Sequence, residues 1–250
     1  MTWVLNNLGL ILELTLVHIS LSVLPIVLGL VIAIPLGWLA YRYRLTRGLI
    51  LTLVGLLYTI PSLAMFVILP PLLGIGFLSE ANVLIALTIY AVAIMARSVA
   101  DALASVDPDI RQAAVAVGYS SWSRFWTVDL PLAGPVLLAG LRVVAVSTVS
   151  LATVGIIVGV QSLGYLFTNG YQRGILASVL TGVVITVIVA LVFDRLLVLL
   201  GRWLMPWTRL DRSPRRQATD PAANPAPDPA SESTASRPAA DKVLQSGLDR

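Results

Sequence analysis

The sequence has 250 residues, of which 57% are hydrophobic and 12% charged, with a formal net charge of +4 and a mean hydropathy of +0.88. A soluble domain cannot bury that much apolar surface, so the composition excludes an ordinary soluble protein and favours a single membrane domain. The chain contains no cysteine, which excludes disulfides, thiolate metal sites and cysteine nucleophiles.

Long uncharged stretches predict about five transmembrane helices, because roughly 20 residues are needed to cross the hydrocarbon core. The expected membrane domain covers residues 19–204. Pro61 and the pair Pro70-Pro71 interrupt the second stretch, so we expect one kinked helix and an external turn there, in preference to two re-entrant segments. The predicted fold is an all-α polytopic bundle with spans over about 19–41, 49–74, 81–103, 132–158 and 174–200.

The two ends of the chain differ from these spans. Residues 1–18 are apolar but include Glu13 and His18. This pattern predicts a segment that lies along the outer surface, with His18 at the interface and not in a metal site. Residues 213–250 combine repeated prolines with Ala, Asp and Ser, which predicts a disordered cytoplasmic tail.

Arginine placement indicates the orientation. Arginines follow the first span, lie between the third and fourth, and follow the fifth, whereas the opposite loops carry only Arg173 and the acidic Glu80. Positively charged loops stay in the cytoplasm. An odd number of spans then predicts a multi-pass protein of the cell inner membrane with its N-terminus outside and its C-terminus in the cytoplasm.

Two charged residues are expected within a few turns of the cytoplasmic surface. Arg142 follows the start of the fourth span, and Asp101 lies near the end of the third. Because a charge at depth is costly, snorkelling or a structural ion pair is the favoured interpretation. A place at the inner mouth of a transport pathway is the alternative.

The connection between the third and fourth spans, residues 107–131, is long for a membrane bundle. Asp107 suits an N-cap with Pro108 at the first helical position, an alanine-rich stretch follows, and Gly118 ends it. Small side chains on one face would let this short helix seat closely in a groove of another protein. An ordinary amphipathic connector explains these features equally well.

The same loop resembles the cytoplasmic signature of bacterial binding-protein-dependent ABC importer permeases. That signature reads Glu-Ala-Ala, three residues, Gly, nine residues, Ile, any residue, Leu-Pro. The spacing matches throughout, with glutamine replacing the glutamate and valine the isoleucine. The resemblance implies a fold like that of type I ABC importer permeases, in which this segment docks on the ATP-binding subunit. The matching residues are Gln112, Ala113, Ala114, Gly118, Val128, Leu130 and Pro131.

Other stretches look like the subfamily that imports glycine betaine, carnitine, choline and related osmoprotectants. The resemblance implies a permease and not an enzyme, with no cofactor of its own, since ATP and Mg belong to the partner ATPase. It also implies an extracytoplasmic solute-binding protein and a second permease, identical or a paralogue, in a lipid membrane and without nucleic acid. The similar stretches are residues 34–37, 59–64, 71–76, 105–108 and 139–142.

Several alternatives stay open. The solute could be another small molecule such as an amino acid, or the chain could be an ion-driven transporter, a channel subunit or a membrane scaffold. The only lysine is Lys242, so no Walker A loop is present. Between residues 19 and 96 charges lie in loops apart from Glu80, which argues against intramembrane ion sites. Tyrosines and tryptophans fall mostly at predicted interfaces, which argues against a cation–π cage in this chain.

Overall fold

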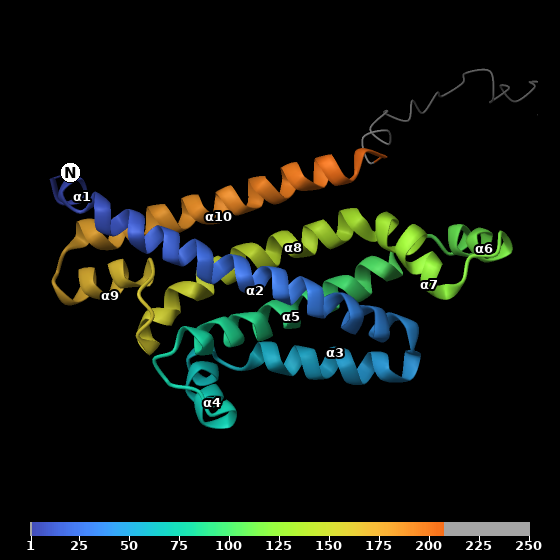
Figure 1. The fold of residues 1–250 in the computed structure, drawn as a ribbon, viewed down its shortest axis with the longest axis horizontal. Helices are drawn as coiled ribbons and strands as arrows, with labels where there is room; N and C mark the ends of the chain where they lie inside the picture. The colour runs from blue at the N-terminus through green and yellow to red at the C-terminus, as the bar shows by residue number, and fades with distance from the viewer. Residues whose placement is uncertain (1, 208–250) are drawn as a thin grey trace, which may run out of the picture. The chain divides into compact units, whose positions relative to one another are not determined.

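The computed structural model describes residues 2–207, and the tail predicted over 213–250 lies outside the described residues. Helices and the turns between them make up this part of the chain (Figure 1). The helices, in chain order, are α1 (Thr2–Asn6), α2 (Leu8–Arg42), α3 (Arg44–Thr59), α4 (Ser62–Leu73), α5 (Glu80–Ala104), α6 (Pro108–Ala116), α7 (Ser121–Arg124), the π-helical turn Phe125–Asp129, α8 (Leu130–Ala152), the 3-10 turn Thr153–Val158, α9 (Gly164–Gln172) and α10 (Leu176–Leu204).

Four helical stretches are long and apolar enough to cross a membrane. α3 and α4 form a bent pair that makes a fifth candidate span. Such long apolar helices satisfy all their backbone hydrogen bonds internally, as hydrocarbon requires. The predicted all-α bundle of about five spans is therefore confirmed. The four stretches are α2, α5, the segment Ser121–Val158 that contains α8, and α10.

The first span begins earlier than expected. α2 starts at Leu8 and runs without a break to Arg42, so residues 8–18 extend this helix and no helix boundary falls at residue 18. His18 is fully buried, and its Nε2 lies 3.0 Å from the carbonyl oxygen of Val149 in α8. The expectation of an interfacial His18 was wrong, because this contact with α8 gives the ring a polar partner inside the bundle.

The second span is two helices where one kinked helix was expected. α3 and α4 meet at Ile60 and Pro61, and the angle between them is 105°. Ile60 has extended backbone angles, φ −66° and ψ 126°, which is the conformation favoured before proline. The hydroxyl of Tyr90 in α5 donates a 2.6 Å hydrogen bond to the Ile60 carbonyl oxygen. The Ile60 carbonyl oxygen lies where the helix is interrupted, and the Tyr90 hydroxyl therefore serves as its polar partner.

α5 is the most deeply buried of the long helices, and α2 packs along it. A Cβ atom added at Gly29 would lie 2.5 Å from the Cβ of Ala91, and one added at Gly37 would lie 2.5 Å from the Cβ of Val99. Each pair is offset by eight residues in the same direction, so α2 and α5 run parallel. Glycine at these two positions lets the helix backbones approach closely, as small residues do in membrane bundles.

α8 and α10 complete the bundle and are joined by an ion pair. Arg142 donates two hydrogen bonds to Asp194, with 2.6 Å from Nε to Oδ1 and 3.0 Å from Nη2 to Oδ2. The ion pair expected for Arg142 is therefore present, although its partner lies 52 residues away in α10. A short helix, α9, occupies part of the loop where only a Gly-rich turn was expected.

Candidate functional site

The loop predicted to couple to another subunit forms a compact helical unit at one end of the bundle. In Figure 1, α6 and α7 lie at the end where α2 turns into α3, opposite the end that holds α1 and α9. The Asp107 carboxylate accepts a 2.8 Å hydrogen bond from the backbone N–H of Asp109, and Pro108 follows the cap. These features start α6 where the sequence predicts it to start.

Gly118 ends α6 in a conformation that favours glycine. Its φ is +98°, and the N–H of Tyr119 donates a 3.1 Å hydrogen bond to the carbonyl oxygen of Ala114. This six-to-one bond is the Schellman arrangement, which satisfies a carbonyl group at the end of a helix. Open space surrounds the position where a Cβ would be added. The requirement for glycine therefore comes from the backbone angle and not from crowding.

Apart from Gly118, the residues of the predicted coupling set divide into two groups. Gln112 and Ala113 are exposed on α6, beside the exposed apolar side chains of Val115 and Val117. Ala114 is buried under α6. Only the first group offers its side chains to another molecule. The second group, which holds the loop against the bundle, consists of Ala114 together with the half-buried Val128, Leu130 and Pro131.

A buried carboxylate connects the loop to the bundle. Asp129 is 4% exposed and accepts hydrogen bonds from Arg111 in α6 at 2.9 Å and from Arg124 in α7 at 3.3 Å. Arg111 also donates to the Leu103 carbonyl oxygen at the end of α5, and its guanidinium lies 4.7 Å from the ring centroid of Tyr41 in α2. This network joins α6 to α2, α5 and the start of α8.

The sequence-based reasoning missed this network. Asp129 occupies the position at which the signature accepts any residue. Its pairing with Arg111 and Arg124 crosses eighteen and five residues of sequence. The charges of the loop offer a partial signal. It has five charged residues, and apart from the cap Asp107 and its neighbour Asp109 they are two arginines and one acid: Arg111, Arg124 and Asp129.

Aromatic rings pack beside the ion pairs. Trp38 in α2 contacts Trp122 and Phe125 edge to face, with ring centroids 6.4 and 5.9 Å apart. Phe125 also packs on Trp126 at 5.1 Å. Edge-to-face ring contacts favour a fixed geometry. The loop thus has both charged and aromatic contacts to the membrane helices, which makes it suitable for transmitting a displacement as one body.

A groove with a few polar side chains among mostly apolar ones, here called the polar groove, runs along α3, α5 and α8 from the end of the bundle that holds α6. It consists of three adjoining cavities of about 640, 410 and 410 Å³. Arg97 lines the first two cavities and Tyr58 the last two. Arg47 and Asp101 lie at the beginning of the groove, 3.9 Å apart and both about half exposed. The structural ion pair expected for Asp101 is therefore present, with Arg47 of α3 as its partner, and it lies at one end of this groove.

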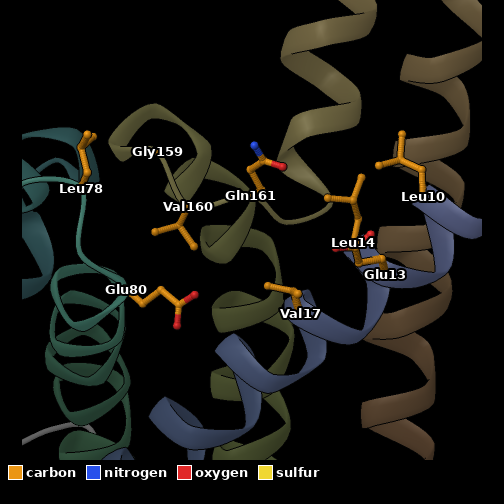
Figure 2. A pocket seen from close by; sticks show the side chains of 9 residues that line it. All are labelled: Leu10, Glu13, Leu14, Val17, Leu78, Glu80, Gly159, Val160 and Gln161. Carbon is orange, nitrogen blue, oxygen red and sulfur yellow. The ribbon is translucent and has the colours of Figure 1, made fainter.

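A further cavity of about 350 Å³ lies at the opposite end of the bundle. Figure 2 shows Glu80 reaching from the start of α5 toward α2, and Gln161 and Val160 on the loop that faces it. Glu13 of α2 also lines this cavity. Its polar lining is acidic and neutral, whereas the end with α6 is rich in arginine. The two ends thus differ in charge as the sequence predicts.

Comparison with known proteins identifies the class. Residues 26–206 match the family described as binding-protein-dependent transport system inner membrane component. The chain is 31% identical over 200 residues to the osmoprotectant import permease protein OsmW of Salmonella typhimurium, covering 78% of this chain and 92% of that protein. It is 32% identical over 204 residues to the choline transport system permease protein OpuBB of Bacillus subtilis, covering 80% and 91%.

Solved structures show the same fold. An inward-facing form of the MetNI methionine ABC transporter aligns with a TM-score of 0.70 at 22% identity, over 80% of this chain and 98% of that one. An amino acid ABC transporter aligns with a TM-score of 0.67 at 15% identity, over 80% and 97%. At these identities the likeness concerns the fold alone. With the family match, it shows that the chain belongs to the binding-protein-dependent inner membrane components, the permease subunits of ABC importers, and is not an enzyme.

Proposed function

We propose that this permease carries a small osmoprotectant with a quaternary ammonium group, in the class of glycine betaine, carnitine and choline. The relatives at 30–32% identity support the substrate class, since their names include osmoprotectant, glycine betaine/carnitine/choline and choline transport. Amino acid import, the alternative, is supported only by structures that share the fold at lower identity.

The observation that carries the proposed mechanism is the contrast between the two sides of α6. Its outer side exposes Gln112, Ala113 and the apolar Val115, while Arg111 on the same helix is held by the buried Asp129. An exposed apolar face on a firmly attached helix suits docking into a groove of a partner, with α6 supplying the small anchor residues. We propose that this partner is the ATP-binding subunit.

The transport step in this proposal is a rigid-body movement. Closure of two ATP-binding subunits would displace α6, and the Asp129 network would pass that displacement to α2, α5 and α8. A second permease copy or paralogue would face this one and close the groove on its open side. The chain itself makes and breaks no covalent bond, and its task is to open and close a path.

The proposed orientation places α6 and the start of the polar groove in the cytoplasm. Arg47, Arg111 and Arg124 lie at this end of the bundle, which fits the preference of basic residues for the cytoplasmic side. The opposite end, with Glu13 and Glu80, would then meet the solute-binding protein. Solute would enter there and leave through the groove.

The experiment is reconstitution of the chain with its cognate ATP-binding subunit and solute-binding protein in liposomes. We expect uptake of radiolabelled choline or glycine betaine that depends on ATP and on the binding protein. We also expect the ATP-binding subunit to copurify with the permease. Copurification without uptake of any quaternary ammonium solute would contradict the substrate class, and absence of copurification would contradict the docking role of α6.

A further inference from the structure

The last cavity of the polar groove has aromatic and hydroxyl groups on its wall. It measures about 410 Å³ and lies where α3 breaks into α4, against α5 and α8. Tyr58 is 14 residues from the start of α3 at Arg44, so it lies about 20 Å along the helix from that end. In a bilayer this depth is well within the hydrocarbon region. Polar side chains at such a depth commonly mark a solute pathway.

The two tyrosine rings form an edge-to-face pair. The ring centroids of Tyr58 and Tyr90 are 6.4 Å apart with an interplanar angle of 80°. Tyr90 is 3% exposed, and its hydroxyl is fixed by the hydrogen bond to the Ile60 carbonyl oxygen. Tyr58 is 54% exposed. One ring is thus held in place and supports the second, which is exposed and lines the cavity.

Three serine hydroxyls on the same wall have no hydrogen-bond partner among residues 2–207. They belong to Ser62 in α4 and to Ser147 and Ser150 in α8. Hydroxyls nearby behave differently: Ser98 in α5 donates to the Ile94 carbonyl oxygen, and Thr153 donates to that of Ser150. Hydroxyl groups within a membrane need a polar partner, so these three are available to water or to a solute.

Charged side chains are absent from the described residues that line this cavity. An anion or a primary amine would therefore find no ion pair here. A quaternary ammonium group has no N–H to donate, carries a diffuse charge, and is attracted to the face of a tyrosine ring. The free hydroxyls would bond to the polar end of the same solute. A cavity of about 410 Å³ is large enough, since small-molecule sites are typically 300–1,000 Å³.

We propose that this cavity is a transit site for the quaternary ammonium group of the carried solute, with Tyr58 as the contacting ring and Tyr90 as its support. The inference rests on the proposed function, because it takes the solute class from there. It departs from the expectation, drawn from the mostly interfacial placement of tyrosines and tryptophans, that this chain has no cation–π cage. The hydrogen bond of Tyr90 to the Ile60 carbonyl oxygen at the end of α3 holds its ring beside Tyr58.

The test measures solute binding by the purified permease–ATPase complex in the absence of the solute-binding protein. Equilibrium dialysis with radiolabelled choline should detect binding to the wild-type complex. The uncharged tert-butyl isostere of choline should compete poorly. We expect Tyr58→Leu to raise the dissociation constant about tenfold, which corresponds to the larger cation–π contributions, and Tyr58→Phe to stay within about twofold of wild type.

The matched control is Tyr171→Leu, because Tyr171 lies in α9 and is 85% exposed, away from the groove. It should bind choline as wild type does. The double variant Ser147→Ala/Ser150→Ala should weaken choline binding while the isostere remains a poor competitor. Each variant is first checked by size-exclusion chromatography for an intact complex and for retained basal ATPase activity.

Three results would overturn the transit site. They are absence of choline binding by a wild-type complex that imports choline, binding by Tyr58→Leu equal to wild type, and loss of the assembled complex in Tyr58→Leu. The last would mean that the cavity wall is an assembly surface for the second permease. None of these results would contradict the proposed function. That proposal is contradicted only if the fully reconstituted wild-type complex does not import quaternary ammonium solutes.

Discussion

Arg111 and Asp129 form an ion pair that connects α6 to the residue just before the membrane helix α8, with 2.9 Å between Nε and Oδ1. Their side chains are only 14% and 5% exposed. Removing one partner of a buried pair leaves an uncompensated charge, which typically costs about 3–5 kcal/mol. The position of α6 relative to the bundle therefore depends on this contact more than on any exposed charge in the loop.

Asp129→Asn should be the most damaging substitution in this network, because it leaves two arginines without their carboxylate. We expect the variant to insert into the membrane but to retain the ATP-binding subunit poorly. Arg124→Gln should be milder, since its distance to Asp129 is 3.3 Å and its side chain is more exposed, at 20%. ATPase copurification and limited proteolysis of the loop measure both effects. Arg173→Gln is the control, and equal behaviour of all three variants would contradict the network's role.

Gly118→Ala should weaken the coupling loop through backbone strain alone. Its φ of +98° is unfavourable for a residue with a Cβ, by about 1–2 kcal/mol, although no atom stands near the added Cβ. Gly118→Asp adds a carboxylate to the proposed docking surface and should abolish uptake with normal membrane levels. Gly9→Ala is the control, because a Cβ added at Gly9 also meets no atom within 4 Å but the backbone there does not have a positive φ. Normal uptake by Gly118→Asp would show that α6 does not couple.

The seam between α2 and α5 should be sensitive to a single methyl group. Gly29→Ala places its Cβ 2.5 Å from the Cβ of Ala91, and overpacking of this kind costs about 1–3 kcal/mol. We expect a lower amount of protein in the membrane and a lower unfolding temperature in detergent. Adding Ala91→Gly should restore both, because it exchanges the positions of the small and the larger residue. Failure of the double variant to recover would mean that the backbones are held apart by other contacts.

Arg142 and Asp194 should tolerate joint replacement better than single replacement. Asp194→Leu leaves an unpaired guanidinium on a membrane helix, and Arg142→Leu leaves an unpaired carboxylate, whereas the double leucine variant removes both charges together. We expect each single variant to accumulate poorly and the double variant to approach the wild-type level. Quantitative blotting of membrane fractions checks this order. A double variant worse than both singles would indicate that the pair itself serves transport.

The proposed orientation predicts opposite results from reporter fusions at the two ends. A cytoplasmic reporter joined after Trp207, or after Arg216 in the tail, should be active, while an exported-compartment reporter at the same place should be silent. A reporter before Leu8 should show the reverse pattern. If the exported-compartment reporter after Trp207 were active, α6 would lie outside the cell and could not meet an ATP-binding subunit.

The long helices could be predicted because an uncharged run of about 20 residues in a membrane has only the helix to satisfy its backbone. α6 could be predicted because its start and end depend on local chemistry at Asp107, Pro108 and Gly118. The start of α2 could not, since the polar His18 is acceptable inside the bundle only through its contact with Val149. Tertiary contacts of this kind are invisible in a single sequence.

Two further features could not be predicted from the sequence for the same reason. They are the angle between α3 and α4, and the aromatic cavity beside the break. Pro61 indicates that a helix is interrupted, but the 105° bend depends on what Ile60 meets in α5. Tyr58, Tyr90 and Ser147 are far apart in sequence and meet on three helices. Asp129 was overlooked because the family signature places no requirement on its position. The bend, the cavity and the Asp129 ion pairs all depend on distances between residues of different helices, which only the structure provides.

Because of the π-helical turn Phe125–Asp129, the direction in which α6 and α7 project from α8 depends on the number of residues in the turn. In this turn the N–H of Leu130 reaches back five residues to the carbonyl oxygen of Phe125, one more than in an α-helix. Deleting one residue, for example Thr127, would regularise the helix but rotate α6 and α7 by about 100° about the axis of α8. Chimeric permeases that exchange this loop should therefore tolerate many side-chain differences but no change in length before Leu130.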